Sequence, residues 1–203
     1  MLLDARATPG LPRYSKAKGG GLRCYAQPRG TAAVQLVVLH QWGAHTSLVQ
    51  RPGETLEACA IRRGRSVPYH LRVFANPVDP ADPIVVWAWD ETISSWASNG
   101  FNRTSVAIGV GGRFPEFESK RLSVHSALAG IESGLVSALG AVAAALPGLT
   151  IVTHRQSSSG RRADPGEGIA RIAAKAAPGF GLRVDYQRTT GTGRSAAIWA
   201  ENS

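Results

Sequence analysis

The sequence has few of the residues and segments that define several classes of protein. Its 203 residues include two cysteines, Cys24 and Cys59, which are too few and too far apart for a zinc knuckle or a dense disulfide scaffold. One disulfide between them is possible, but two unpaired thiols are the default expectation. No run of about 18 apolar residues exists, so we expect no membrane span.

The N-terminal segment, residues 1–21, lacks the apolar core of a secretion signal. We therefore expect synthesis in a cytoplasm. Action on a cell wall would follow lysis, delivery by a phage or a secretion machine, or loss of a leader. No RNA- or DNA-binding motif and no internal repeat stand out, and the arginines are scattered along the chain.

Positive charge is what the sequence has in excess, with a formal net charge of +9 and a pI of about 10.4. This excess favours an anionic partner, such as nucleic acid, acidic lipid or an anionic cell-wall polymer. The length fits one domain with extensions. With 43% hydrophobic and 18% charged residues, the composition is that of an ordinary globular protein.

Strand and helix patterns alternate along the chain. Short apolar or alternating runs predict strands at residues 33–40, 69–74, 84–89, 105–110, 149–153, 182–186 and 196–199. Apolar spacing near 3.6 and stop signals predict helices at residues 54–63, 118–146 and 167–176. The sequence therefore predicts a single α/β domain, residues 31–177, with a central mixed sheet flanked by helices. We expect residues 1–30 to form a basic Gly/Pro-rich arm, and residues 178–203 to form a C-terminal extension with a β-hairpin.

Three side chains with metal-binding chemistry follow predicted strands. His40 and His154 each end a strand, and Asp164 lies ten residues after His154, before Pro165 and Gly166. Two imidazoles and one carboxylate leave a fourth tetrahedral position open, as in catalytic zinc sites. Two alternatives stay open: each histidine can be a hydrogen-bonded structural residue, and Asp164 can be the N-cap of the helix at 167–176.

Four segments in order resemble motifs of zinc-dependent N-acetylmuramoyl-L-alanine amidases, a family that includes phage lysozyme-like amidases and peptidoglycan recognition proteins. The segments are VVLHQWG, VPYHLRVF, WDETISSWASNGFNRTSVAIGVGG and THRQSSSGRRADPG, which together run from about residue 33 to residue 176. The last is the most specific, because the family has a histidine followed ten residues later by an aspartate in a Gly-Arg-Lys-x-Asp-Pro-Gly loop.

The resemblance implies a peptidoglycan hydrolase that holds one Zn²⁺ through His40, His154 and Asp164. Its substrate would be the amide between N-acetylmuramic acid and L-alanine of the stem peptide. Tyr69 matches a tyrosine near the zinc and would donate a hydrogen bond to the bound water or to the oxyanion. The alternative role of Tyr69 is packing in the strand with an exposed hydroxyl. Arg162 stands where the family often has a lysine. A guanidinium still stabilises negative charge, but it stays protonated and is a poor proton donor.

Other positions depart from the family pattern. Gly109 stands where many relatives have a glutamate as general base, although the phage-like and recognition-protein branches also lack it. Gln41 replaces a common second histidine, which points to altered substrate contacts there. His70 alternates with Tyr69 along the strand, so we interpret it as structural. Trp87 and Trp89 are expected in the core.

The polar stretch after residue 95 is the predicted substrate-binding segment. We expect Trp96, Asn99, Phe101 and Asn102 to contact peptidoglycan, with the two aromatic side chains as a groove wall for sugar rings. We expect a monomer and no nucleic-acid partner. The alternative function is a non-catalytic peptidoglycan-binding module of the same fold.

Overall fold

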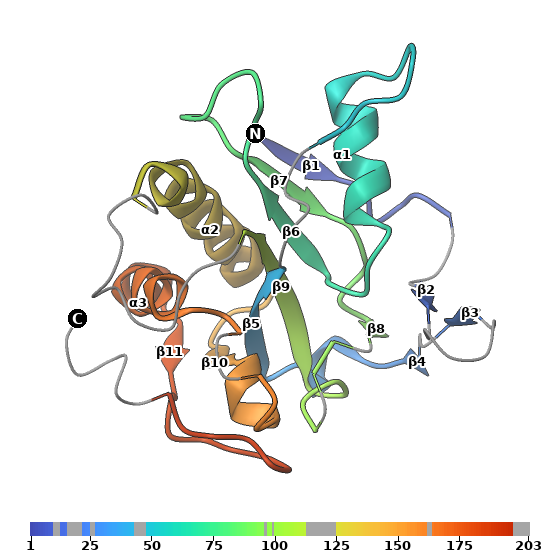
Figure 1. Ribbon diagram of the computed structural model, residues 1–203. Coiled ribbons are helices and arrows are strands. Elements are labelled where there is room, and N and C mark those ends of the chain that lie inside the picture. Colours follow the sequence, from blue (N-terminus) through green and yellow to red (C-terminus); the bar gives the residue numbers. More distant parts are fainter. Residues whose placement is uncertain are drawn as a thin grey trace.

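A seven-stranded sheet forms the centre of the protein (Figure 1). The computed structural model describes residues 1–9, 13–15, 22–24, 27–42, 48–95, 97–98, 100–112, 125–161 and 164–196. The strands of this sheet are β1 (Leu2–Asp4), β5 (Leu36–Trp42), β6 (Leu71–Phe74), β7 (Ile84–Trp87), β9 (Ser105–Gly111), β10 (Thr150–Thr153) and β11 (Arg183–Val184). Their spatial order is β1-β7-β6-β9-β5-β10-β11. Only the β6–β7 pair of this sheet is antiparallel, so the predicted mixed sheet is confirmed.

Shorter elements surround the sheet. The helices are α1 (Leu56–Gly64), α2 (His125–Ala145) and α3 (Glu167–Ala176), with 3-10 turns η1 (Thr31–Ala33), η4 (His154–Ser157) and η5 (Ala177–Phe180). Two small antiparallel pairs join β2 (Arg13–Ser15) to β3 (Leu22–Cys24) and β4 (Gln27–Pro28) to β8 (Ile93–Ser94). The predicted α/β domain with flanking helices is therefore confirmed, although residues 118–124 of the long predicted helix lie outside the described ranges.

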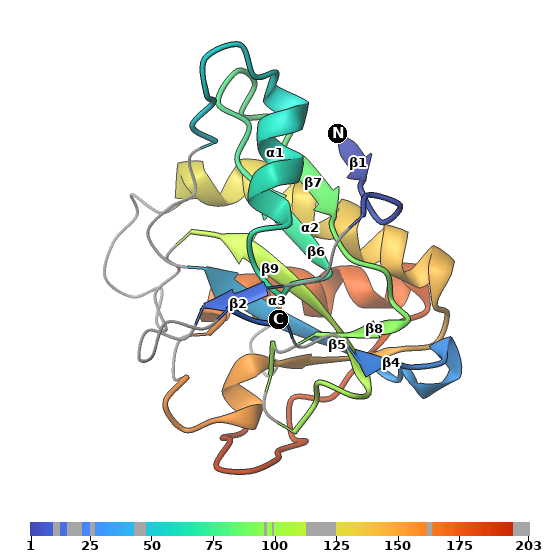
Figure 2. The same cartoon turned by 90° about the vertical axis from the view of Figure 1, so that its right-hand side faces the viewer.

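The helices cover opposite faces of the sheet (Figures 1 and 2). Helices α2 and α3 pack together on one face, and α1 packs against β6 and β7 on the other. The apolar stripe predicted for the long helix is buried against the sheet at Ile131, Leu135, Leu139, Val142 and Leu146. Gly134 allows the close approach of α2, because a Cβ there would lie 2.6 Å from Cγ1 of Val73. Within the described ranges, no helix combines the length and apolarity needed to cross a membrane.

The first strand differs from the sequence-based expectation. Residues 1–30 were expected to form an arm, yet Leu2–Asp4 form the parallel edge strand β1 beside β7. Three residues are too short to show a period of two, so only the tertiary pairing identifies this strand. The N-terminal amine fixes it further, because it donates to the carbonyl of Pro83 at 2.8 Å.

The C-terminal segment also contributes to the main sheet. Arg183–Val184 form β11, which pairs in parallel with β10. The chain then turns back, and the backbone N–H of Ala196 donates to the carbonyl of Tyr186 at 2.8 Å. Residues 197–199 of the predicted second strand lie outside the described residues, so the hairpin stays a prediction. Cys59 is a buried free thiol, so the disulfide that the sequence allowed does not form.

Candidate metal centre

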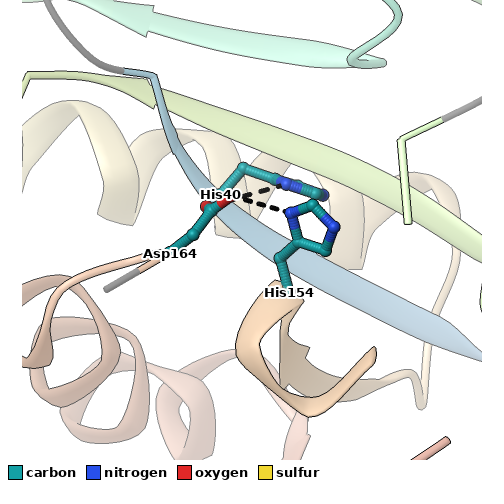
Figure 3. Close-up of side chains that lie close together, drawn as sticks. All are labelled: His40, His154 and Asp164. Atoms are coloured by element: carbon teal, nitrogen blue, oxygen red, sulfur yellow. Dashed lines mark hydrogen bonds and ion pairs between the residues drawn. The ribbon is translucent and has the colours of Figure 1, made fainter. Parts of the chain in front are cut away.

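The three candidate metal ligands meet at one edge of the sheet (Figure 3). His40 lies in β5, and His154 directly follows β10 in η4. These strands are parallel neighbours, with Leu39 opposite Thr153, so their carboxyl ends carry the two imidazoles to the same place. Asp164 completes the cluster, and one potential ligand atom from each residue lies within 4.8 Å of the others.

The carboxylate of Asp164 faces the Nδ1 atoms of both imidazoles (Figure 3). Its Oδ2 is 2.7 Å from Nδ1 of His154, and its Oδ1 is 3.8 Å from Nδ1 of His40. The imidazole centroids are 4.4 Å apart. His40 is fully buried, while His154 and Asp164 are 7% and 9% exposed. The cluster therefore lies just beneath the surface, with each imidazole presenting Nδ1 to the carboxylate.

Hydrogen bonds fold the loop after His154 back on itself. The backbone N–H of Arg155 donates to the carbonyl of Asp164 at 2.8 Å, which closes the loop at its base. Inside it, Ser157 Oγ donates to the carbonyl of His154 at 2.9 Å. The N–H of Arg161 donates to the carbonyl of Ser158 at 3.0 Å. These bonds explain why residues ten positions apart share one site.

The alternative role of Asp164 as a helix N-cap does not fit the structure. The N-cap of α3 is Gly166, and no side chain caps that helix end. Instead, Oδ1 of Asp164 accepts the backbone N–H of Gln41 at 2.8 Å. The side chain of Gln41 also holds the loop, since its Oε1 accepts the N–H of Gly166 at 3.1 Å. Gln41 thus positions the aspartate loop.

Burial and neighbouring charges set the protonation of the cluster. Burial, followed by the electrostatic influence of the neighbouring His154 imidazole, lowers the pKa of His40 to about 4, so the His40 imidazole is neutral at pH 7. Burial opposes ionisation of Asp164, but the hydrogen bond with His154 and the nearby imidazole of His40 outweigh it and hold the pKa of the carboxyl below its usual range. A neutral imidazole next to a carboxylate is the protonation state that binds a divalent cation.

The donor atoms fit a zinc ion. Nδ1 of His40 is buried and has no hydrogen-bond partner among the described residues. A buried polar atom without a partner is costly, and binding a cation would satisfy it. Two imidazole nitrogens and one carboxylate are ligands that Zn²⁺ favours, and they leave a fourth position for water or substrate.

Tyr69 lies beside the cluster and directly over Gly109. The ring centroids of Tyr69 and His40 are 4.8 Å apart. A Cβ on Gly109 would lie 2.8 Å from Cε2 of Tyr69 and closer still to Cδ2, so only glycine leaves room for the ring. Burial, followed by the negative charge of Asp164, raises the pKa of Tyr69 to about 12, so the hydroxyl keeps its proton.

His70 has the structural role expected from strand alternation. It is fully buried, and its Nδ1 accepts the N–H of Ala107 at 3.0 Å. Nε2 must then carry the proton, and it lies 2.8 Å from the carbonyl of Ile93. Burial, followed by the positive charge of Arg29, lowers the pKa of His70 to about 4. Both nitrogens are satisfied by backbone groups, so this imidazole is a neutral link between β6, β8 and β9.

The structure places the predicted substrate-binding residues in different environments. Phe101 is 3% exposed and packs with Leu36, Val38 and Val152, so its prediction as a groove wall is wrong. Its polar neighbours suggested exposure, but its ring fills the core beneath β5. Trp87 and Trp89 are 4% and 3% exposed, as expected of core residues.

The remaining predicted site residues are less fully described. Oδ1 of Asn102 accepts the backbone N–H groups of Ala97 and Ser98, which gives this side chain a structural role. Its contact with substrate stays a prediction. Trp96, Asn99 and Arg162 lie outside the described residues.

Sequence reasoning missed two residues at the site. Ser98 Oγ lies 2.9 Å from Nε2 of His40, and Ser98 is 1% exposed. Arg161 extends its guanidinium to 4.0 Å from Oδ2 of Asp164, with a side chain that is 57% exposed. A serine in a polar loop carries no distinguishing pattern. The sequence shows the Arg161-Arg162 pair, but only Arg162 matches the family motif, so the motif gives no role to Arg161.

The C-terminal segment holds the turn that carries His154. Gln156 is fully buried, and its Nε2 donates to the carbonyls of Asp185 and Arg188 at 2.8 and 2.5 Å. Its Oε1 accepts the N–H of Thr153 at 2.7 Å. Gly193 packs directly on the backbone here, because a Cβ would overlap the carbonyl oxygen of Gln156. Residues 185–193 therefore support η4.

Comparison with known proteins identifies the fold of the chain. No family model and no curated protein matches the sequence. Among solved structures, the endolysin of the Thermus scotoductus MAT2119 bacteriophage Ph2119 is similar, with a TM-score of 0.51 at 19% identity over 87% of this chain and 99% of the endolysin. The chain has the fold of a phage endolysin. The fold expected from the four motifs is thereby confirmed.

Two further solved structures align with a similar share of this chain. The N-acetylmuramoyl-L-alanine amidase LysC from Clostridium intestinale URNW has a TM-score of 0.48 at 14% identity, over 86% of this chain and 96% of the amidase. Wild-type PGRP-LB from Drosophila has a TM-score of 0.47 at 16% identity, over 86% of this chain and 93% of that protein.

Proposed function

We propose that this protein is a zinc-dependent peptidoglycan hydrolase that cleaves the amide between N-acetylmuramic acid and L-alanine of the stem peptide. The observation that carries the proposal is the cluster of His40, His154 and Asp164 at the strand ends of a chain with a phage endolysin fold. The four ordered sequence motifs support the same substrate. The unsatisfied Nδ1 of His40 supports a metal ion at the cluster.

His40, His154 and Asp164 would hold the ion. Bound zinc lowers the pKa of a coordinated water to about 7 and polarises a carbonyl. The chain supports this chemistry by keeping His40 neutral and Asp164 ionised, and by burying both side chains beneath the surface. The backbone N–H of Gln41 fixes one oxygen of Asp164. These contacts give the donor set a fixed geometry before any ion binds.

Tyr69 would donate a hydrogen bond to the oxygen that gains negative charge when the amide is attacked. Its hydroxyl keeps its proton at neutral pH, because its pKa is raised to about 12. Its ring is fixed between His40 and Gly109. A donor fixed in advance stabilises developing charge more than a mobile one does, because it needs no reorganisation during the reaction.

An arginine of the loop would add a positive charge beside the same oxygen. Arg162 is the residue that the motif assigns to this role. Arg161 supports the presence of positive charge at the mouth of the site, since its exposed guanidinium lies 4.0 Å from Asp164. Either guanidinium stabilises an oxyanion but does not supply a proton at neutral pH.

The overall charge fits a cell-wall substrate. A net charge of +9 attracts the protein to an anionic wall and raises its local concentration there. We propose that the protein reaches the wall after lysis or through delivery by a phage or a secretion machine, and that it acts as a monomer.

The second candidate function is a module of the same fold that binds peptidoglycan without cutting it. Gly109 favours this candidate, because it removes the carboxylate that many relatives use as general base. The intact cluster of two histidines and one aspartate favours the enzyme, since a binding module has no need of metal ligands.

Metal analysis and a dye-release assay on purified cell walls separate the two candidates. For the enzyme, we expect one zinc per chain and dye release that a chelator abolishes. His154→Ala should lose zinc and activity together, whereas Tyr69→Phe should keep zinc and lose about 10²–10³-fold in rate. Bound zinc without chelator-sensitive release would support the binding module, and full lysis by His154→Ala would exclude the proposed site.

A further inference from the structure

His40 has two ring nitrogens with different surroundings. Nδ1 faces Asp164 at 3.8 Å and has no hydrogen-bond partner among the described residues. Nε2 lies 2.9 Å from Oγ of Ser98, which is 1% exposed. A neutral imidazole carries one proton, so a lone pair at Nδ1 requires the proton to be on Nε2. Ser98 is the hydrogen-bond partner that the structure places there.

We propose that Ser98 is a positioning residue that accepts the Nε2–H of His40 and so holds Nδ1 ready for the metal ion. The inference rests on the proposed metal site. A ligand histidine whose second nitrogen donates a hydrogen bond has a fixed tautomer and ring orientation. For His40 this partner is the hydroxyl of Ser98. The sequence around Ser98 has no pattern that identifies this role.

A tight turn holds Ser98 in place. Oδ1 of Asn102 accepts the backbone N–H of Ala97 at 2.9 Å and that of Ser98 at 2.5 Å. In return, the carbonyl of Ser98 accepts the N–H groups of Phe101 and Asn102, both at 3.1 Å. The buried ring of Phe101 anchors the turn in the core. The two predicted substrate contacts, Phe101 and Asn102, therefore fix the serine that contacts the metal ligand.

Arg29 fastens this turn to the rest of the protein. Its Nη1 donates to the carbonyl of Asn102 at 2.9 Å, and its Nη2 donates to the carbonyl of Ser105 at 2.7 Å. Its Nε donates to the carbonyl of Glu91 at 2.9 Å. One guanidinium thus joins the segment before β8 to the end of the loop that leads into β9. The hydrogen bonds form a continuous chain from Arg29 through Asn102 and Ser98 to His40.

The same loop offers a matched control. Ser95 is also buried, at 2% exposure, but its Oγ lies 3.4 Å from Nδ1 of the structural His70. Removing either hydroxyl deletes a buried serine oxygen next to a buried histidine. Only Ser98 reaches a proposed metal ligand. If removing a buried hydroxyl only disturbed loop packing, zinc affinity would fall in both the Ser98 and the Ser95 variants. If Ser98 positions the ligand, zinc affinity should fall only in the Ser98 variants.

The test measures zinc affinity by chelator competition for the full chain and for Ser98→Ala, Ser98→Cys and Ser95→Ala. Ser98→Cys keeps nearly the same volume but replaces the oxygen with a weak acceptor, so it separates hydrogen bonding from packing and serves if Ser98→Ala does not fold. We expect both Ser98 variants to bind zinc on the order of 10–100-fold more weakly. Ser95→Ala should match wild type. The absorption spectrum of bound Co²⁺ should change in the Ser98 variants alone.

Two results would overturn the inference while leaving the proposed function intact. One is a wild-type protein that binds zinc and releases dye, with Ser98 variants of equal zinc affinity. The other is an equal loss of affinity in Ser95→Ala. A wild-type protein that binds no zinc would overturn both the inference and the proposed function.

Discussion

Replacing Gly109 with alanine tests the placement of Tyr69. Gly109 lies in β9, opposite His40 of β5 on one side and Arg72 of β6 on the other. An added Cβ would lie 2.8 Å from Cε2 and 2.9 Å from Cγ of Tyr69. Carbon atoms at optimal contact are about 3.5–4.0 Å apart. The ring of Tyr69 must therefore move by about 1 Å or lose its contact with β9.

The size of the effect follows from this displacement. Overpacking a buried site costs about 1–3 kcal/mol of stability. A shift of about 1 Å in a group that orients the reaction can cost about 100-fold in rate. The contacts that hold the three candidate metal ligands do not involve this ring, since Oδ2 of Asp164 lies 2.7 Å from Nδ1 of His154 and its Oδ1 accepts the N–H of Gln41. We therefore expect Gly109→Ala to keep its zinc, unfold more easily and lose about 100-fold in dye-release rate.

Two control variants make this prediction specific. Gly179→Ala adds a methyl group where no atom lies within 4 Å, so it should be as stable and active as wild type. In a Tyr69→Ala background the ring is absent, so Gly109→Ala should no longer cost stability. Denaturant unfolding of the wild type, the two single variants and the double variant would show this. If Gly109→Ala has wild-type rate and stability, the ring of Tyr69 does not lie over Gly109 and the assigned role of Tyr69 loses its basis.

Two further variants test other parts of the structure. Because the pKa of His70 is about 4 in the native state against 6.5 in the unfolded chain, the unfolded chain takes up the proton first as pH falls from 6.5 to 4. The stability that this neutral imidazole contributes, about 3 kcal/mol, is then lost. Urea unfolding at pH 7 and pH 4 should show the stability gap between wild type and His70→Gln narrowing by about that amount; a constant gap would contradict the buried, neutral state. Gly193→Ala should push the C-terminal segment away from Gln156, and so destabilise the turn of His154 and weaken zinc binding. Unchanged zinc affinity and melting temperature would show that this segment does not support the site.

Much of the candidate metal centre could be predicted from local sequence. His40 and His154 each follow a short apolar run, and parallel strand ends meet at one edge of a sheet. The loop to Asp164 has the composition of a tight polar turn. The structure brings these three residues together because β5 and β10 are neighbours, with Leu39 opposite Thr153.

The contacts that support the site could not be predicted in the same way. Ser98 reaches His40 only because the loop between β8 and β9 folds against β5, and a serine among polar residues carries no pattern. The burial of Phe101 could not be predicted for the same reason. Its neighbours in sequence are polar, but packing against β5 buries its ring. The contact of Tyr69 with Gly109 brings the segment before β6 against β9, and neither segment's own sequence shows that the two meet.

The most direct test of the account is to identify the bond that the protein cleaves. Purified peptidoglycan would be digested with the zinc-loaded protein, with His154→Ala and with chelator present, and the products analysed by mass spectrometry. We expect stem peptides with a free amino group on L-alanine and glycan strands with a free lactyl carboxylate, formed only by the zinc-loaded wild type. Cleavage at another bond, or no cleavage by a zinc-loaded protein, would contradict it.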